Sequence, residues 1–408
     1  MDITLASAFI GTSDGDTAEA ILRACVHCGY CNATCPTYQL LSDERDGPRG
    51  RIYLIKQVLE GATPTRETQV HLDRCLTCLS CETTCPSGVG YGALLEIGRR
   101  VVDTAVPRPT VERAMRWGLS HGLTSPAFAP ALRLGQIMRP LAPASLRAQI
   151  PLARPSGLWP ERTHPRKVLL LTGCVQPALA PNINSATARV LDALGVQSVV
   201  VTEAGCCGAV HEHLGDHATA IDDIRRNIDA WWPLLVENTA EAVIVNASGC
   251  GVMVKDYGEH LKDDPAYADK ARLVAERACD PVTFLQGELA GLSARVTARR
   301  SQRIAFHAPC TLQHGLHLTG QIECLLRTLG FTVDVPREAN LCCGSAGTYS
   351  VLQPALSNAL RERKLKHLIA NQPERILSAN IGCITHLQAI SDVPVCHWLE
   401  FLDEAIAT

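Results

Sequence analysis

The sequence lacks the features that mark nucleotide-binding and nucleic-acid-binding proteins. It contains no G-x-G-x-x-G segment after a predicted strand and no P-loop, which argues against a dinucleotide or nucleoside triphosphate fold. Aromatic residues make up only 4% of the 408 residues, so surfaces that stack on bases are not expected. The formal net charge of −3 gives no reason to expect nucleic acid as a partner.

Long apolar runs and a secretion signal are also missing from the sequence. One of the longest uncharged runs, Val168 to Ala188, contains two prolines, two asparagines and a glutamine, which does not suit a membrane span. The first basic residue is Arg23, so the N-terminus has no positively charged region of the kind that opens a signal peptide. We therefore expect a cytoplasmic chain whose contact with a membrane is peripheral, on the cytoplasmic face of the inner membrane.

Cysteine, in contrast, is abundant, and eight of the 19 cysteines form two copies of one motif. Each copy reads C-x2-C-x2-C-x3-C-P, which is the bacterial ferredoxin pattern for a [4Fe–4S] cluster. Three cysteines of a copy bind one cluster, and the fourth reaches the other cluster in two-cluster proteins. The predicted ligand sets are Cys25, Cys28, Cys31 and Cys85 for the first cluster, and Cys75, Cys78, Cys81 and Cys35 for the second.

Disulfides and zinc are the two alternatives for these eight cysteines. Disulfides are disfavoured in a cytosolic protein. Zinc sites pair two C-x2-C units, and the third cysteine of each copy would have no role in such a site. The sequence therefore predicts two [4Fe–4S] clusters and a chain that moves single electrons.

A second cysteine repeat occupies the C-terminal half of the chain. In each copy a single cysteine is followed 32 residues later by Cys-Cys-Gly and later still by one more cysteine, and the copies are about 136 residues apart. A period of this length indicates two homologous lobes rather than a solenoid. The repeated cysteines are Cys174, Cys206, Cys207 and Cys250 in the first lobe, and Cys310, Cys342, Cys343 and Cys383 in the second.

Apolar runs and helical periodicity alternate in both lobes. This alternation predicts two α/β lobes with mainly parallel sheets, and it places the repeated cysteines at the carboxyl ends of strands. The expected strands cover 167–172, 197–202 and 242–246, then 303–307, 332–335 and 375–379; the expected helices cover 184–194 and 218–237, then 320–329 and 355–369.

The second repeat resembles the CCG domains of heterodisulfide reductase and related iron–sulfur subunits. Full versions of that motif end in C-x2-C, whereas Ala247 and Asn380 stand here in place of the first of those two cysteines. Four thiolates per lobe suffice for a further iron–sulfur cluster or for zinc, and both alternatives stay open. The remaining cysteines, Cys279, Cys324 and Cys396, are expected to be buried structural thiols, and none of the neighbouring histidines is expected to be a ligand.

The fold class expected from these observations is α+β overall. A mainly helical, ferredoxin-like module with two [4Fe–4S] clusters spans 1–105, and a connector rich in proline and arginine spans 106–166. The first CCG lobe spans 167–300 and the second spans 301–408. Within the connector, 113–160 contains six arginines and no Asp or Glu, which suits either a simple linker or a basic apolar face that docks on a partner or on anionic lipid.

The segment between the two motifs carries one further observation. Ile52, Ile55, Val58 and Leu59 follow a helical spacing that predicts an ordinary amphipathic helix. The arginines at its start, at positions 49 and 51, are candidates to offset the negative charge of a cluster.

From Ile21 to Phe401 the chain resembles the iron–sulfur subunits of bacterial glycolate oxidase, also called glycolate dehydrogenase. The segments that carry the resemblance include ILRACVHCGYCNATCPTYQLL, HLDRCLTCLSCETTCPSGV, EAGCCGAV and LCCGSAGTY. The resemblance implies an oxidoreductase complex in which flavin-containing subunits oxidise glycolate to glyoxylate. This chain then carries neither flavin, NAD nor catalytic residues, and passes electrons through its clusters toward membrane quinone.

Three other functions remain compatible with the sequence. The chain could serve a related complex that oxidises D-lactate or glycerol 3-phosphate. It could reduce a quinone or a disulfide at its CCG lobes, or it could be an assembly subunit whose metal centres are structural.

Overall fold

The computed structural model describes residues 1–143, 147, 150–296 and 302–406. By the contacts among its residues the chain divides into two compact units. The N-terminal unit combines Met1–Arg116 with Asn340–Lys364, and the second unit combines Trp117–Ala339 with Leu365–Thr408. The CCG turn of the second lobe therefore belongs to the N-terminal unit, although the division of the chain into four parts at 105, 166 and 300 stays a prediction.

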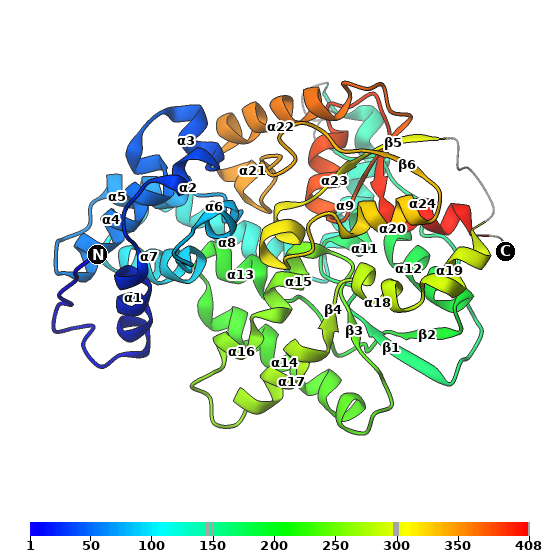
Figure 1. The fold of residues 1–408 in the computed structure, drawn as a ribbon, viewed down its shortest axis with the longest axis horizontal. Coiled ribbons are helices and arrows are strands. Elements are labelled where there is room, and N and C mark those ends of the chain that lie inside the picture. The colour runs from blue at the N-terminus through cyan, green and yellow to red at the C-terminus, as the bar shows by residue number, and fades with distance from the viewer. Residues whose placement is uncertain (144–146, 148–149, 297–301, 407–408) are drawn as a thin grey trace. The chain divides into compact units, whose positions relative to one another are not determined.

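The N-terminal unit is helical throughout, as expected for its ferredoxin-like module (Figure 1). All residues of Met1–Arg116 are described, and no strand occurs among them. Its helices are α1 (Ser13–Ala24), α2 (Tyr30–Ala33), α3 (Pro36–Leu41), η1 (Glu44–Asp46), α4 (Pro48–Leu59), α5 (Arg66–Asp73), α6 (Ser80–Thr84), α7 (Tyr91–Ala105) and α21 (Tyr349–Leu352), while α8 (Thr110–Thr124) and α22 (Pro354–Leu368) begin in it.

The core of this unit forms between α4 and α7, which lie wholly within it. Ile55 and Leu59 of α4 are fully buried, as the helical spacing predicts, and so are Leu94 and Leu95 of α7. Helix α1 adds Leu22 to the same cluster of apolar side chains. Burial of these side chains on both sides of the two motifs holds the cysteine loops in place.

The second unit contains two sheets, each of four parallel strands (Figure 1). The first sheet has the order β2-β1-β3-β4 and the second has the equivalent order β6-β5-β7-β8, which confirms the two α/β lobes. The strands are β1 (Arg166–Leu170), β2 (Val196–Val199), β3 (Val243–Ile244), β4 (Ala278–Cys279), β5 (Arg303–His307), β6 (Thr332–Asp334), β7 (Arg375–Ser378) and β8 (Val395–His397).

The helices of the second unit follow the strands of the two lobes in alternation. Those of the first lobe are α11 (Gln176–Leu179), α12 (Asn182–Ala193), α13 (Ala209–Leu214), α14 (His217–Val236), α15 (Ser248–Lys255), α16 (Tyr257–His260), α17 (Ala268–Arg277), α18 (Pro281–Gly287) and α19 (Leu289–Arg295). Those of the second lobe are the π-helical turn η3 (Thr311–Gly315), α20 (Gln321–Thr328), α23 (Ile381–Gln388) and α24 (Trp398–Ala405).

The inner strand β1 of the first sheet is buried on both faces, as is typical of parallel sheets. Val168 and Leu170 of β1 point into a core that the two lobes share, whereas Leu169 points into a second core that contains Trp231 of α14. The lobes also join through the backbone, because Ser248 N–H donates to the Ala379 carbonyl at 3.1 Å. The two lobes therefore form one packed body within the second unit.

The connector is partly helical. It forms α8, α9 (Phe128–Met138) and the short η2 (Arg139–Leu141). Leu134 and Ile137 of α9 and Leu141 of η2 are exposed, and no residue of α9 is buried. The connector therefore presents an apolar face to solvent. Of residues 144–149, the structure describes Arg147 alone.

Substitution of Gly344, the glycine of the second CCG turn, tests how tightly this turn packs against the backbone of α22. Gly344 has φ +89°, and a Cβ atom built there lies 2.4 Å from the Ser357 carbonyl oxygen. We expect Gly344→Ala to lower the free energy of unfolding by about 2 kcal/mol or more, because it adds left-handed strain and a backbone clash. Urea unfolding followed by circular dichroism measures this loss as a lower midpoint.

Gly122 is a matched control for this substitution. It lies inside α8 with no atom within 4 Å of the position of an added Cβ. Gly122→Ala is expected to stabilise the helix by about 0.5–1 kcal/mol. Equal urea midpoints for the two variants would show that the description of the turn at Gly344 is wrong.

Candidate metal centres

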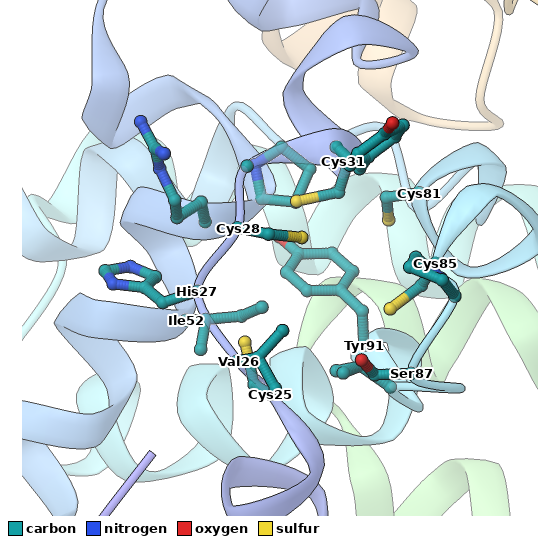
Figure 2. A pocket seen from close by; sticks show the side chains of 16 residues that line it. Cys25, Val26, His27, Cys28, Cys31, Ile52, Cys81, Cys85, Ser87 and Tyr91 are labelled. Atoms are coloured by element: carbon teal, nitrogen blue, oxygen red, sulfur yellow. The ribbon is translucent and has the colours of Figure 1, made fainter.

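Four cysteines of the predicted first set line one cavity. Cys25, Cys28, Cys31 and Cys85 surround an empty volume of about 430 Å³ that is partly open to solvent, and Cys81 of the predicted second set lines the same cavity. Figure 2 shows the sulfur atoms of these side chains directed toward the same space. Four sulfur donors around one cavity fit the ligand requirement of an iron–sulfur cluster.

The cysteines of the predicted second set line another cavity. Cys35, Cys75, Cys78 and Cys81 surround an empty volume of about 300 Å³. The fourth cysteine of each motif thus lies with the first three of the other motif, as the crossed arrangement requires. The grouping in space agrees with the predicted sets, whereas binding of a cluster by each thiol stays a prediction.

Tyr91 forms part of the wall of both cavities. Its side chain is buried at the start of α7, and its hydroxyl donates to Cys75 Sγ at 3.6 Å. Burial, and after it the neighbouring Cys75, raises the pKa of Tyr91 far above its usual range, so the hydroxyl keeps its proton. A neutral donor beside a cluster ligand stabilises the thiolate form of that ligand. No motif in the sequence indicates a role for Tyr91.

Left-handed backbone produces the sharp turn of both cysteine loops. His27 has φ 58° and Gly29 has φ 85°, and the equivalent residues Thr77 and Leu79 have φ 51° and 59°. Such conformations cost roughly 1–2 kcal/mol for residues other than glycine. In the second loop the turn directs the backbone N–H of Thr77 to Cys75 Sγ at 3.4 Å. Strain repeated at equivalent positions is typical of sites where a ligand fixes the backbone.

Burial disfavours the charged form of the thiols. It raises the pKa of Cys31 to about 11, with further contributions from Cys25 and Cys28, and it raises the pKa of Cys81 well above its usual value. Metal binding requires thiolates and therefore releases protons. Basic side chains near the cavities lower the cost of this charge.

Arg51 is the basic residue at the centre of the second cavity wall. Only 1% of its surface is exposed, and its guanidinium donates to the His71 carbonyl at 2.7 Å and lies 3.6 Å from Asp46. Asp46 is also fully buried and binds His71 Nδ1 at 3.0 Å and Arg74 at 2.9 Å. The group Arg51, Asp46, His71 and Arg74, here called the Arg51 network, fixes a positive charge inside the unit.

Arg51 stays protonated although its guanidinium is buried. Desolvation lowers its pKa, but the acidic neighbours Cys75, Cys35 and Asp46 raise the pKa, which lies above its ordinary value. The positive charge therefore faces two sulfur atoms of the second cavity. This placement supports the expectation that an arginine offsets negative charge at a cluster.

Arg49 occupies a different environment. Its Nε donates to Glu44 Oε1 at 2.5 Å, and both side chains are about one-third or more exposed. The guanidinium lines the first cavity and lies near Cys31. Since Glu44 neutralises Arg49 and solvent screens it, its effect on a cluster is expected to be the smaller one.

The four repeated cysteines of the first CCG lobe meet in one place. Cys206 contacts both Cys174 and Cys207, and Cys207 contacts Cys250. These contacts lower the pKa of Cys206 and raise those of Cys174 and Cys207. The lobe thus supplies four adjacent sulfur donors, which fit either zinc or iron.

The CCG turn has the same geometry in both copies. Gly208 has φ 95° and its N–H donates to Cys206 Sγ at 3.4 Å. Gly344 has φ 89° and its N–H donates to Cys342 Sγ at 3.4 Å. The cysteines of the second copy are divided between the units, with Cys342 and Cys343 in the N-terminal unit, and Cys310 and Cys383 in the second. Their joint binding of a metal stays a prediction.

A buried histidine and carboxylate lie beside Cys206. His211 Nδ1 is 2.7 Å from Asp223 Oδ2, and its Nε2 is 3.3 Å from the hydroxyl of Thr124. Burial, and after it Cys206, raises the pKa of Asp223. One ligand atom of each of Cys206, His211 and Asp223 lies within 4.8 Å of the others. In the sequence, His211 is one of several histidines near the repeated cysteines. Nothing in the sequence indicates a role for Asp223, because that role depends on tertiary packing.

The expectation that the last three cysteines are buried is wrong for Cys324. This cysteine is exposed on α20, where the helix turns its polar face to solvent. Cys279 and Cys396 are partly exposed. They occupy the equivalent edge strands β4 and β8, paired with Ile244 and Leu377, so they follow a symmetry that the sequence did not reveal.

Two protein families match the sequence. The 4Fe-4S dicluster domain family matches residues 21–89, and the cysteine-rich CCG domain family matches 168–255 and 304–388. The matched ranges contain the eight cysteines around the two cavities and the eight repeated cysteines of the lobes.

Curated proteins with similar sequences cover nearly the whole chain. The glycolate oxidase iron-sulfur subunit of Escherichia coli is 53% identical over 95% of both chains. The probable glycolate oxidase iron-sulfur subunit of Bacillus subtilis is 30% identical over 91% of this chain and 89% of its own. Lactate utilization protein A of Bacillus pumilus is 27% identical over 54% of this chain and 90% of its own.

Replacement of Arg51 tests the role of its charge. Arg51→Gln is expected to lower the midpoint potential of the second cluster by on the order of 100 mV, since it removes a buried positive charge near two sulfur ligands at an effective dielectric constant of about 20. Redox titration followed by electron paramagnetic resonance (EPR) measures both clusters. Arg49→Gln is the matched control, and an equal shift of the second cluster in both variants would contradict the assignment.

Proposed function

Because this chain belongs to the family of glycolate oxidase iron-sulfur subunits, we propose that it carries electrons within a glycolate-oxidising complex. The electrons come from a flavin-containing subunit and leave toward membrane quinone. The observation that supports this function best is the pair of neighbouring cavities that share Cys81 and Tyr91. Sites with a common wall suit the transfer of electrons from one to the other.

The chain binds iron–sulfur clusters, and we propose two of the [4Fe–4S] type. When bound, such clusters accept and release one electron at a time. The ligands would be the two crossed sets of four cysteines already described. Arg51 holds a positive charge beside the second set, and Tyr91 donates a hydrogen bond to one of its sulfurs.

The overall reaction balances across the complex. Glycolate loses two electrons and two protons to become glyoxylate, and quinone gains two electrons and two protons to become quinol. A flavin on a partner subunit takes the electron pair and releases single electrons, which is the usual work of flavins between two-electron and one-electron carriers. This chain supplies the path for single electrons and holds no substrate in the proposal.

Association with the membrane is proposed to be peripheral. No helix among residues 1–143, 150–296 and 302–406 is long and apolar enough to cross a bilayer. The exposed apolar face of α9 and η2 includes Arg133 and no acidic residue, a composition that favours contact with anionic lipid.

The CCG lobes are proposed to hold at least one further metal centre. The four adjacent thiols of the first lobe support this proposal most directly. Both an iron–sulfur cluster and zinc suit four sulfur donors, so the metal decides whether the lobe extends the electron path or only stabilises the fold.

Removal of one first-set ligand tests the electron-transfer function. Cys28→Ser is expected to abolish the signal of the first cluster and to reduce glycolate-dependent quinone reduction by the assembled complex by about 100-fold, because one corner of the cluster loses its thiolate. Metal in the CCG lobes should be retained. Cys324→Ser, at an exposed cysteine outside both motifs, should behave as the unchanged protein. Full quinone reduction by a complex with Cys28→Ser would overturn the proposal.

Metal analysis of the anaerobically purified chain tests the cofactors independently of activity. We expect about eight iron and eight sulfide per chain for two [4Fe–4S] clusters, with either more iron or about one zinc for a centre in the lobes. Inductively coupled plasma mass spectrometry and a sulfide assay provide the counts. A chain that contains zinc alone, with all eight N-terminal thiols reactive, would exclude the two-cluster assignment.

A further inference from the structure

The two cluster cavities differ in how they are covered. Among the eight cysteines that line them, all within the described residues, Cys28 is exposed and the other seven are buried or partly buried. In the second cavity Cys35, Cys75 and Cys81 are buried. Cys78 of the second cavity is only partly exposed, so a donor on another subunit can approach a ligand sulfur most closely at Cys28 of the first cavity.

Apolar and aromatic side chains surround the exposed sulfur of the first cavity. Val26 and Tyr30, on either side of Cys28 in the sequence, are 68% and 67% exposed. Tyr53 of α4 is 46% exposed, and its ring lies 6.0 Å from the ring of His27 in a stacked arrangement. Figure 2 shows Val26, His27 and Cys28 on the same loop at the cavity. We call Val26, His27, Cys28, Tyr30 and Tyr53 the first-cavity surface.

Ordinary folding does not require this exposure. Single apolar residues are common on protein surfaces, but a group that covers a functional cavity is typical of an interaction site. Tyrosine is enriched at such sites because it adds a large contact area at a low entropic cost. Arg49 also lines this cavity, but it is paired with Glu44, so the surface around Cys28 lacks the excess of basic side chains that favours a charged lipid surface and suits a protein partner better.

A contact within the N-terminal unit links the second cavity to the segment that carries the second CCG turn. Tyr349 of α21 is buried, and its hydroxyl donates to the carbonyl of Arg74, the residue before Cys75, at 3.2 Å. The same short segment of the N-terminal unit carries the CCG turn with Cys342. Both Cys75 and Cys342 act electrostatically on the hydroxyl of Tyr349. The second cavity thus lies next to the segment that carries the CCG turn.

We infer that the electron-donating flavoprotein docks on the first-cavity surface, so that electrons reach the first cluster before the second and then move toward the CCG turn at Cys342. Electron transfer between proteins slows steeply as the separation of donor and acceptor grows, so the donor must cover the most accessible ligand. This inference rests on the proposed function, since it assigns a place to the donor that the proposed function requires.

Site-specific photo-cross-linking tests the docking surface without reference to activity. Tyr30 is replaced by p-benzoylphenylalanine in the assembled, purified complex, and Val236 on α14, which is 49% exposed, is replaced in the control. Tyr30→p-benzoylphenylalanine should cross-link to the flavin-containing subunit, and the control should not. A cross-link to lipid, or no cross-link to the flavin subunit, overturns the inference.

Charge placed on the surface tests the same inference by affinity and rate. Val26→Glu combined with Tyr30→Glu should weaken binding to the flavin-containing subunit by at least about tenfold. The EPR spectra of the dithionite-reduced clusters should not change, and reduction by glycolate should slow by at least about tenfold. Val236→Glu should change none of these. If the double variant fails to retain its clusters, Val26→Ser with Tyr30→Ser replaces it, and unchanged affinity and rate in that variant overturn the inference.

Failure of the inference and failure of the proposed function give different results. If glycolate does not reduce the clusters of the unchanged complex, the proposed function fails whatever the variants do. If glycolate reduces the clusters equally fast in the unchanged complex and in the surface variants, the docking inference alone fails.

Discussion

The crossed arrangement of eight thiols is the constraint on which the N-terminal unit depends. Cys85 lies with the first three cysteines of the other motif, and Cys35 lies with the three that begin at Cys75. Two loops 50 residues apart in sequence must therefore meet, and the apolar cores of α4 and α7 pack around the place where they do. Metal binding and folding are coupled in such an arrangement, because neither cavity forms without both motifs.

The second constraint is the negative charge of the buried thiolates, which a buried arginine partly offsets. Cluster ligands are thiolates in a region that burial makes unfavourable for negative charge. The Arg51 network places a fixed cation at the second cavity, and Asp46 holds that cation in position through two further partners. Among the described residues that line the first cavity, the arginine is the partly exposed, acid-paired Arg49, so the electrostatics of this cavity depend more on solvent or on a docked partner.

The sequence predicted those features that follow from local pattern. The two copies of the cysteine motif predicted which cysteines lie together around each cavity. The apolar runs predicted the bounds of strands β1 and β5 to within two residues. The helical spacing of Ile52, Ile55 and Leu59 correctly predicted a buried face. Each of these depends on residues that are close in sequence or on a repeat that can be read directly.

Features that depend on distant packing could not be predicted. Strands β4 and β8 are two and three residues long, too short to show a period, and the pairing with β3 and β7 defines them. The environment of the buried Asp46 and Arg51 depends on His71 and Arg74, which contact this pair and lie 20 or more residues away in the sequence. Tyr349 lies more than 270 residues from Arg74 in sequence, so no local pattern connects it to the second cavity.

In the proposed function, electrons from glycolate enter the clusters of this chain during turnover. Rapid freeze-quench EPR of the assembled complex mixed with glycolate tests it most directly. We expect EPR signals of reduced [4Fe–4S] clusters to appear on the time scale of glycolate oxidation and to disappear when quinone is added. Clusters that stay oxidised while glycolate is consumed at the full rate would contradict it.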